Sequence, residues 1–125
     1  MNRKIKFRTW YDKLNKLYYP DFYAFEGEYI LWDWQLGDFR KASDKIQQYT
    51  GVKDKNGREI YEGDIVKFKW EVYEHDVEDG IGEVFFENGI FLFSRVEEFA
   101  MNDSNFLKHT IEVIGNIYEN PELPR

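Results

Sequence analysis

The stretch YTGVKDKNGREIYEGDIVKF, residues 49–68, decides the fold because it sets two turns between short strand patterns. Asp54-Lys55-Asn56-Gly57 is a turn tetrad, since Asn and Gly tolerate positive φ. Glu62-Gly63-Asp64 is a second tight turn, in which the Asp64 carboxylate can accept hydrogen bonds from backbone N–H groups. From Ile65 onward, the chain alternates between two sets of residues, which predicts a strand with one face turned inward. The first set is Ile65, Lys67 and Lys69, and the second is Val66, Phe68 and Trp70.

Similar patterns continue on both sides of this stretch. Asn88-Gly89, after Glu87, separates two apolar runs at 81–86 and 90–93, which is the strongest short hairpin signal. Residues 5–10 alternate with the period of a strand. Aromatic runs at 17–25 and 28–34, separated by Glu26-Gly27, indicate another hairpin.

The remaining segments give weaker signals. Residues 71–80 are acidic and predict a polar connection. Residues 40–48 fit a short helix or an irregular connection, and residues 94–107 fit one or two helical turns beside the sheet. Residues 111–118 predict the last strand, and the two prolines at 121 and 124 stop it because proline lacks the N–H donor.

Many short strands joined by tight turns predict a mainly β fold, and closure into a barrel would remove exposed sheet edges. We therefore expect a single domain over residues 1–125: a small SH3-like β-barrel with short helical segments and an N-terminal β extension. Residues 49–118 would form the barrel core, and residues 1–48 would add strands and a hairpin packed on it. Whether residues 11–48 complete the barrel stays open.

Composition narrows the classes of protein. The chain has no cysteine, which excludes disulfides and thiolate metal sites and fits a reducing, cytoplasmic compartment. No run approaches the roughly 18 apolar residues of a membrane span. The net charge of −7 opposes simple binding to a phosphate backbone.

Basic residues nevertheless gather at the N-terminus, where residues 1–20 hold six Lys or Arg against one Asp. A strand here would project Lys4, Lys6, Arg8 and Trp10 from one face, a row that could meet phosphates and stack a base. The alternative is a basic edge strand that balances the acidic body and discourages edge-to-edge pairing. A third possibility is that the acidic surface imitates DNA.

Three blocks of sequence together resemble the YopX family of phage and prophage proteins. They are IKFR at 5–8 followed by Trp10, the run from YTG at 49–51 through KNG at 55–57 to IYEGDIV at 60–66, and EVIGNIYENP at 112–121. The resemblance implies a small SH3-like β-barrel, a prophage origin and no assigned catalytic residues.

The chain carries no motif of catalysis. It contains no G-x-S-x-G, P-loop or dinucleotide fingerprint, and His75 and His109 lie apart in polar stretches without metal-ligand spacing. The acidic residues at 71–79 depart from a calcium-loop pattern and read better as a solvated loop. We expect no enzymatic activity, cofactor or metal.

Aromatic residues are too numerous for the inward faces of alternating strands, so some should lie at an interface. The candidates for it are Trp32, Trp34, Trp70 and Tyr23. We therefore expect a non-catalytic interaction module that binds a host or phage protein, or a second copy of itself. Nucleic-acid binding through the N-terminal row is the alternative.

Overall fold

The computed structural model describes residues 6–11, 16–19, 22–25, 28–33, 38–41, 46–73, 76–97, 100–101 and 103–125. The chain divides into two compact units, Met1–Gln48 and Tyr49–Arg125. The described residues are mainly β, as predicted, and their strands form antiparallel sheets.

In the first unit, β1 (Phe7–Tyr11) has neighbours on both sides. It pairs with β2 (Lys16–Tyr18) on one side and with the start of β6 (Ile46–Lys53) on the other. The expectation of an edge strand here is therefore wrong, because β6 returns from nearly forty residues away to cover the second edge.

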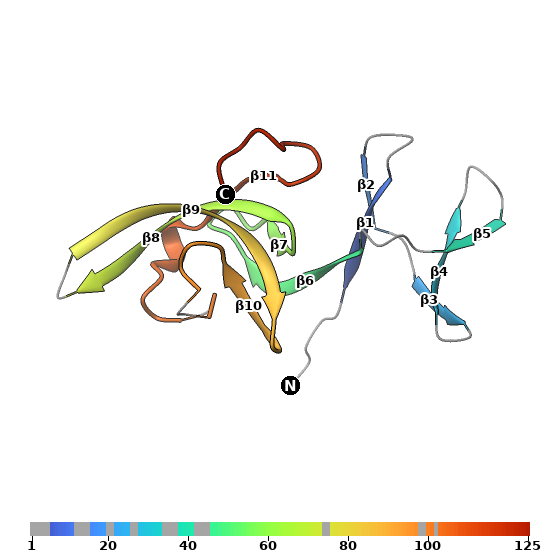
Figure 1. Ribbon diagram of the computed structural model, residues 1–125, viewed down its shortest axis with the longest axis horizontal. Helices are drawn as coiled ribbons and strands as arrows, with labels where there is room; N and C mark the ends of the chain where they lie inside the picture. Colours follow the sequence, from blue (N-terminus) through green and yellow to red (C-terminus); the bar gives the residue numbers. More distant parts are fainter. Residues whose placement is uncertain are drawn as a thin grey trace. The chain divides into compact units, whose positions relative to one another are not determined.

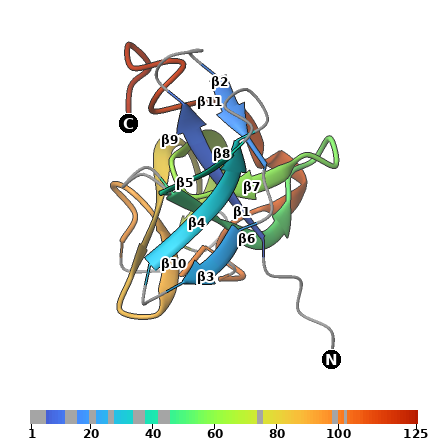
Figure 2. The same cartoon turned by 90° about the vertical axis from the view of Figure 1, so that its right-hand side faces the viewer.

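A separate sheet of the first unit has the order β3-β4-β5 (Figure 2). It consists of β3 (Phe22–Phe25), β4 (Glu28–Asp33) and β5 (Asp38–Lys41). The predicted aromatic hairpin is present as β3 and β4, with Phe25 opposite Glu28. Residues 40–48 hold the end of β5 and the start of β6, so the helical alternative is wrong for their described part.

The second unit contains a sheet with the order β10-β9-β8-β11 (Figure 1). Its strands are β8 (Asp64–Tyr73), β9 (Asp76–Glu87), β10 (Ile90–Phe93) and β11 (Glu112–Asn116). The rest of β6 pairs with β7 (Glu59–Tyr61), with Lys53 opposite Glu59. A short 3-10 helix, η1 (Lys108–Thr110), precedes β11.

The expected polar connection at residues 71–80 is wrong, because β8 and β9 run through its described part. Figure 1 shows the two strands continuing together past the ends of β10 and β11. Asp76, Val77, Glu78 and Asp79 are all exposed. A two-stranded ribbon that needs no buried face tolerates such residues, so the acidic composition did not reveal it.

The turns carry the backbone conformations that their residues favour. Gly57 and Gly63 have φ of 80° and 81°, next to Asn56 and Asp64 in their respective turns. The Asp64 carboxylate accepts a hydrogen bond from the Tyr61 N–H at 2.8 Å. Asn88 and Gly89 form the two-residue loop between β9 and β10, with φ of 52° and 82°, the sign that a type I′ turn requires at both positions.

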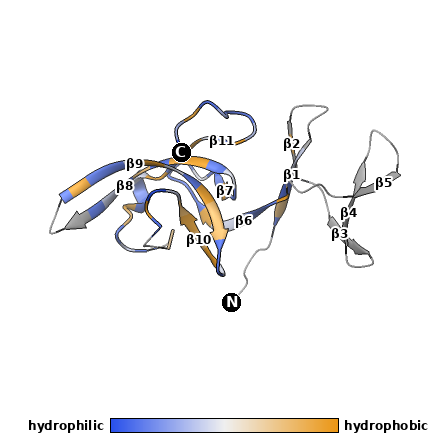
Figure 3. Cartoon of the chain, in the orientation of Figure 1, coloured by the Kyte–Doolittle hydropathy of each residue, from blue (hydrophilic) through white to orange (hydrophobic). Residues whose placement is uncertain are grey.

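Three phenylalanine rings form the centre of the core in the second unit. Phe68 and Phe93 stack with ring centroids 4.5 Å apart, and Phe106 meets both rings edge-on at 5.3 and 5.0 Å. Ile60 of β7 joins the same cluster, so the β6–β7 hairpin shares this core. Figure 3 shows the apolar colouring along β10, which contributes Phe93.

No ring of strand pairings closes among the described strands. The SH3-like barrel therefore stays a prediction, whereas the mainly β class is confirmed. In residues 94–107 the described positions form turns and isolated β-bridges at Ala100 and Phe106, so the expected helical turns are wrong for this part.

Candidate functional site

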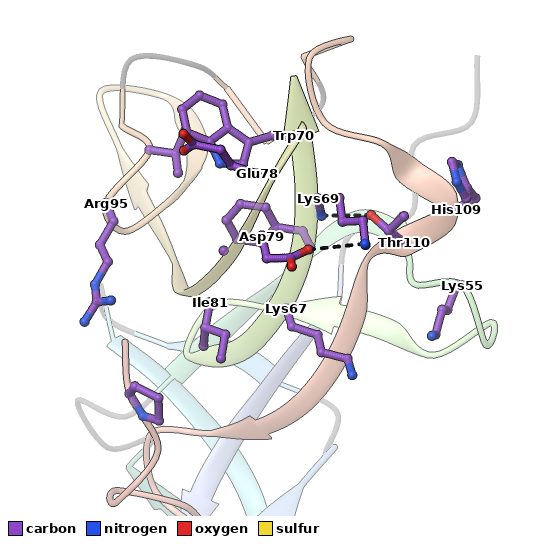
Figure 4. Close-up of a pocket in the computed structure, with 14 residues that line it drawn as sticks. Lys55, Lys67, Lys69, Trp70, Glu78, Asp79, Ile81, Arg95, His109 and Thr110 are labelled. Atoms are coloured by element: carbon purple, nitrogen blue, oxygen red, sulfur yellow. Dashed lines mark hydrogen bonds and ion pairs between the residues drawn. The ribbon is translucent and has the colours of Figure 1, made fainter. Parts of the chain in front are cut away.

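A cleft of about 910 Å³ lies on the β8–β9 ribbon of the second unit (Figure 4). Residues 67–70 of β8 and 78–81 of β9 line it, together with side chains from the segments after β10 and around η1. Both faces of β8 contribute to this lining. Phe68 turns into the core, whereas Lys67 and Lys69 are exposed on the opposite face.

Trp70 is the aromatic residue at the rim of this cleft. It is half-buried, packs against the apolar core and forms an isolated bridge with Phe106. A half-buried tryptophan combines a fixed position with accessible apolar surface. This arrangement is suited to anchoring a partner.

The lysines of the cleft face carboxylates. Lys67 and Lys55 lie 3.2 and 3.8 Å from the Glu112 carboxylate, and Lys69 lies 3.4 Å from Asp79. The hydrogen bond from Lys67, followed by the charge of Lys55, lowers the pKa of Glu112 against the opposing effect of burial. The surface of the cleft therefore carries both signs of charge.

The segment around η1 covers the outer edge of β8. Thr110 Oγ1 accepts a hydrogen bond from the Lys69 N–H at 2.9 Å and donates one to the Leu107 carbonyl at 2.6 Å. The Leu107 N–H donates to the Lys69 carbonyl at 2.9 Å, and the Glu71 N–H donates to the Asn105 carbonyl at 2.9 Å. These bonds fix the wall of the cleft on that side.

Arg95 contributes a cation at the other side of the cleft. Its backbone has φ of 75°, an uncommon value for a residue with a side chain. Its guanidinium donates to the Arg125 carbonyl at 3.3 Å, which ties it to the C-terminal segment. No feature of the sequence predicted Arg95, since its position follows from a turn after β10 that carries no glycine.

The N-terminal row that was predicted to contact nucleic acid is not exposed at Arg8 and Trp10. Arg8 and Trp10 are 1% and 5% exposed, and Arg8 Nε donates to Gln47 Oε1 at 2.7 Å. This expectation is wrong for both side chains, because a side chain that is almost fully buried cannot meet a phosphate or stack on a base. Lys6 is half-buried, and Lys4 lies outside the described residues.

The predicted aromatic interface is only partly described. Trp34 lies outside the described residues. Tyr23 and Trp32 stand opposite Ile30 and Phe39 in the β3-β4-β5 sheet, and their side chains lie outside the described part. Trp70 lines the cleft. Sequence reasoning missed Lys67 and Lys69 as site residues, although the alternation along β8 placed them opposite its inward face.

Comparisons with known proteins agree with the resemblance in the sequence. The family described as YopX protein matches residues 6–124. The chain belongs to the YopX family. The crystal structure of protein EF1440 from Enterococcus faecalis is similar to this YopX-family chain, with a TM-score of 0.61 and 26% identity over 97% of this chain and 98% of that one. No curated protein matches it.

The described part of this YopX-family protein lacks two features of other functional classes. Within it, no group of three or more His, Cys, Asp or Glu side chains could hold a metal ion. The same residues include no helix of the length and apolar character that crossing a membrane requires. His109 is exposed at the cleft, and His75 lies outside the described residues.

Proposed function

We propose that this protein is a non-catalytic interaction module of prophage origin that binds another protein in the bacterial cytoplasm. The observation that carries the proposal is the cleft on β8 and β9, where half-buried Trp70 lies beside paired charges of both signs. Protein interfaces combine an aromatic anchor with a polar rim in this way.

The pairing of the charges supports a protein partner over a polyanion. A phosphate backbone gains its affinity from cations that exchange small counterions. Here Lys67 and Lys55 already face Glu112, and Lys69 faces Asp79. A polyanion would have to compete with these carboxylates, whereas a polypeptide carrying charges of both signs could complement them.

Nucleic-acid binding remains the second candidate because three lysines and Arg95 line the same cleft. It would now use these cations in place of the predicted N-terminal row, of which Arg8 and Trp10 are buried. A second copy of the chain and a host protein that recognises an acidic, DNA-like surface are further partner hypotheses.

We also retain the SH3-like barrel as a proposal for residues 49–118. Its support is the turn before β8, where the Gly63 N–H donates to the Val84 carbonyl at 2.8 Å and the Gly63 carbonyl accepts from the Ile117 N–H at 2.9 Å. This turn thus joins β9 to the end of β11. Closure predicts that β7 pairs with a second strand on the side away from β6, which NMR contacts between backbone protons of the two strands would detect, and their absence would contradict it.

Replacing Trp70 by alanine tests the proposed function. We expect the variant to lose affinity for its protein partner by about tenfold or more, because truncating an interface tryptophan removes a large buried anchor. Lys69→Glu removes the cation that is paired with Asp79 and should change the affinity for the same protein. The measurement is affinity capture from nuclease-treated and untreated bacterial lysate at two salt concentrations, followed by titration of the captured protein.

Lys53 provides the matched control, because it is exposed on β6 and does not line the cleft. Lys53→Glu makes the same charge change as Lys69→Glu and should leave capture intact. Thermal unfolding of each variant separates lost binding from lost structure. Capture that is indifferent to both cleft variants, or that yields only nuclease-sensitive, salt-sensitive nucleic acid, would reject a protein-binding cleft.

A further inference from the structure

Strand β9 has different neighbours along its length. Residues 76–83 pair with β8 on one side, and residues 84–87 pair with β10 on the other. Within the part of the chain that the structure describes, no strand pairs with the second side of residues 76–82. This edge of β9 is therefore open, whereas the corresponding outer edge of β8 is covered by the segment around η1.

The register identifies which backbone groups point outward from this edge. The Lys69 carbonyl and the Glu71 N–H bond to Leu107 and Asn105, so both point away from β9. Residues opposite each other in an antiparallel ladder turn their backbone groups toward each other or both away. Asp79 and Val77, their register partners, therefore direct their own N–H and carbonyl groups away from β8.

The alternation extends the assignment to Ile81, two residues further along β9. Glu83, the next member, provides an independent check. Its carbonyl accepts from the Ser94 N–H and its own N–H donates to Ser94 Oγ, both at 2.9 Å, on the side away from β8. Residues 77, 79 and 81 thus direct their backbone N–H and carbonyl groups away from β8, with the spacing that a strand ladder requires.

The cleft follows this edge. Four consecutive residues of β9, at 78–81, line it, although neighbouring side chains on a strand point to opposite faces. The β8 lining also includes both faces, with Lys67 and Lys69 on one and Phe68 and Trp70 on the other. The cleft therefore borders both faces of β9 over residues 78–81, a segment whose second edge is covered by no strand through residue 82 among the described residues.

The charge of the edge selects its occupant. Asp76, Glu78 and Asp79 are exposed along it, and the Asp79 carboxylate lies 3.4 Å from the Lys69 ammonium group. A second copy placed edge to edge would set these carboxylates against their own equivalents, and like charges directly opposite each other are destabilising. A strand bearing Lys or Arg would meet them with opposite charge.

Building on the proposed function, we propose that the protein partner supplies an extended, basic segment that pairs with residues 76–81 of β9 as an added strand. Backbone hydrogen bonds to Val77, Asp79 and Ile81 provide the affinity, and the carboxylates provide the preference for basic side chains. Trp70 lines the same cleft and offers an apolar contact to the added strand.

A synthetic peptide of alternating Val and Lys residues, seven residues long, is the probe, with a Val and Glu peptide as its counterpart. In the full chain we expect the Lys peptide to slow hydrogen exchange at the amides of Val77, Asp79 and Ile81. Val77→Pro should weaken its binding by about tenfold, because proline removes one outward donor. Val77→Ala keeps the N–H and should bind the peptide like the unchanged chain.

The charge preference has its own test. Glu78→Lys should weaken binding of the Lys peptide by about fivefold and strengthen binding of the Glu peptide, as expected for one cross-strand charge reversal. Equal binding of both peptides, unprotected edge amides, or self-association abolished by Val77→Pro would each overturn the inference. Lysate capture that depends on Trp70 but not on Val77→Pro would overturn strand addition alone. Capture from the lysate that Trp70→Ala leaves unchanged would overturn the proposed function.

Discussion

Replacing Phe93 by alanine is expected to lower the free energy of unfolding by about 3–5 kcal/mol, the usual cost of emptying a buried phenylalanine site. Phe93 is completely buried, stacks on Phe68 and receives the edge of Phe106. Both neighbouring rings would lose their contacts at once. Because they are held by β8 and by the segment before η1, they cannot collapse far into the cavity.

Phe86 is the matched control for this change, since it is 44% exposed on the adjacent strand β9. It contacts Phe91 with ring centroids 4.8 Å apart, so Phe86→Ala should cost about 1 kcal/mol. Urea titration of the three proteins measures the difference. Similar losses for the two variants would show that the Phe68, Phe93 and Phe106 rings are not the centre of the core.

Replacing Asp54 by alanine is expected to cost about 2–4 kcal/mol, because its carboxylate accepts three backbone hydrogen bonds. Oδ1 accepts from the Asn56 and Arg58 N–H groups, both at 2.9 Å, and Oδ2 accepts from the Val113 N–H at 3.0 Å. The side chain therefore closes the β6–β7 turn and joins it to β11. Water can reach the turn, but the buried Val113 N–H would lose its acceptor.

Asp103 supplies the control, because among the described residues its carboxylate accepts one backbone hydrogen bond, from the Asn105 N–H at 2.9 Å. Asp103→Ala should cost about 1 kcal/mol. The comparison uses urea titration at neutral pH. If the two alanine variants lose the same stability, the link from the turn to β11 contributes nothing beyond a local turn.

The same carboxylate makes stability depend on pH. Burial raises the pKa of Asp54, but the hydrogen bonds from Val113, Arg58 and Asn56 and the charge of Arg58 outweigh burial and hold the pKa below its ordinary value. Because the folded pKa is lower than the unfolded one, the contribution is complete above the unfolded pKa and is lost as the pH falls through the folded pKa. Asp54→Asn should flatten the acid limb of the stability profile, and an unchanged limb would contradict this assignment.

Local chemistry made the turns and short hairpins predictable. Asn88-Gly89 and Asn56-Gly57 combine residues that tolerate positive φ, and the structure has turns at both places. The inward face of β8 also followed from alternation. These features depend on a few consecutive residues, so one sequence contains the information that determines them.

Features that depend on distant pairing could not be predicted in the same way. Arg8 was predicted to lie in an exposed row because no residue near it in the sequence indicates that β6 pairs with the second edge of β1. The ribbon after Lys69 looked like a polar loop because neither face of a two-stranded ribbon needs apolar residues. The wall that Thr110 contributes to the cleft arises from a hydrogen bond across some forty residues.

Hydrogen-exchange footprinting of the full chain with its captured partner tests the binding cleft most directly. We expect slowed exchange at residues 67–81, in the β8–β9 ribbon, with the remainder of the described sheets little changed. Protection confined to residues 7–11, or to any surface away from Trp70 and β9, would contradict a protein-binding site in this cleft.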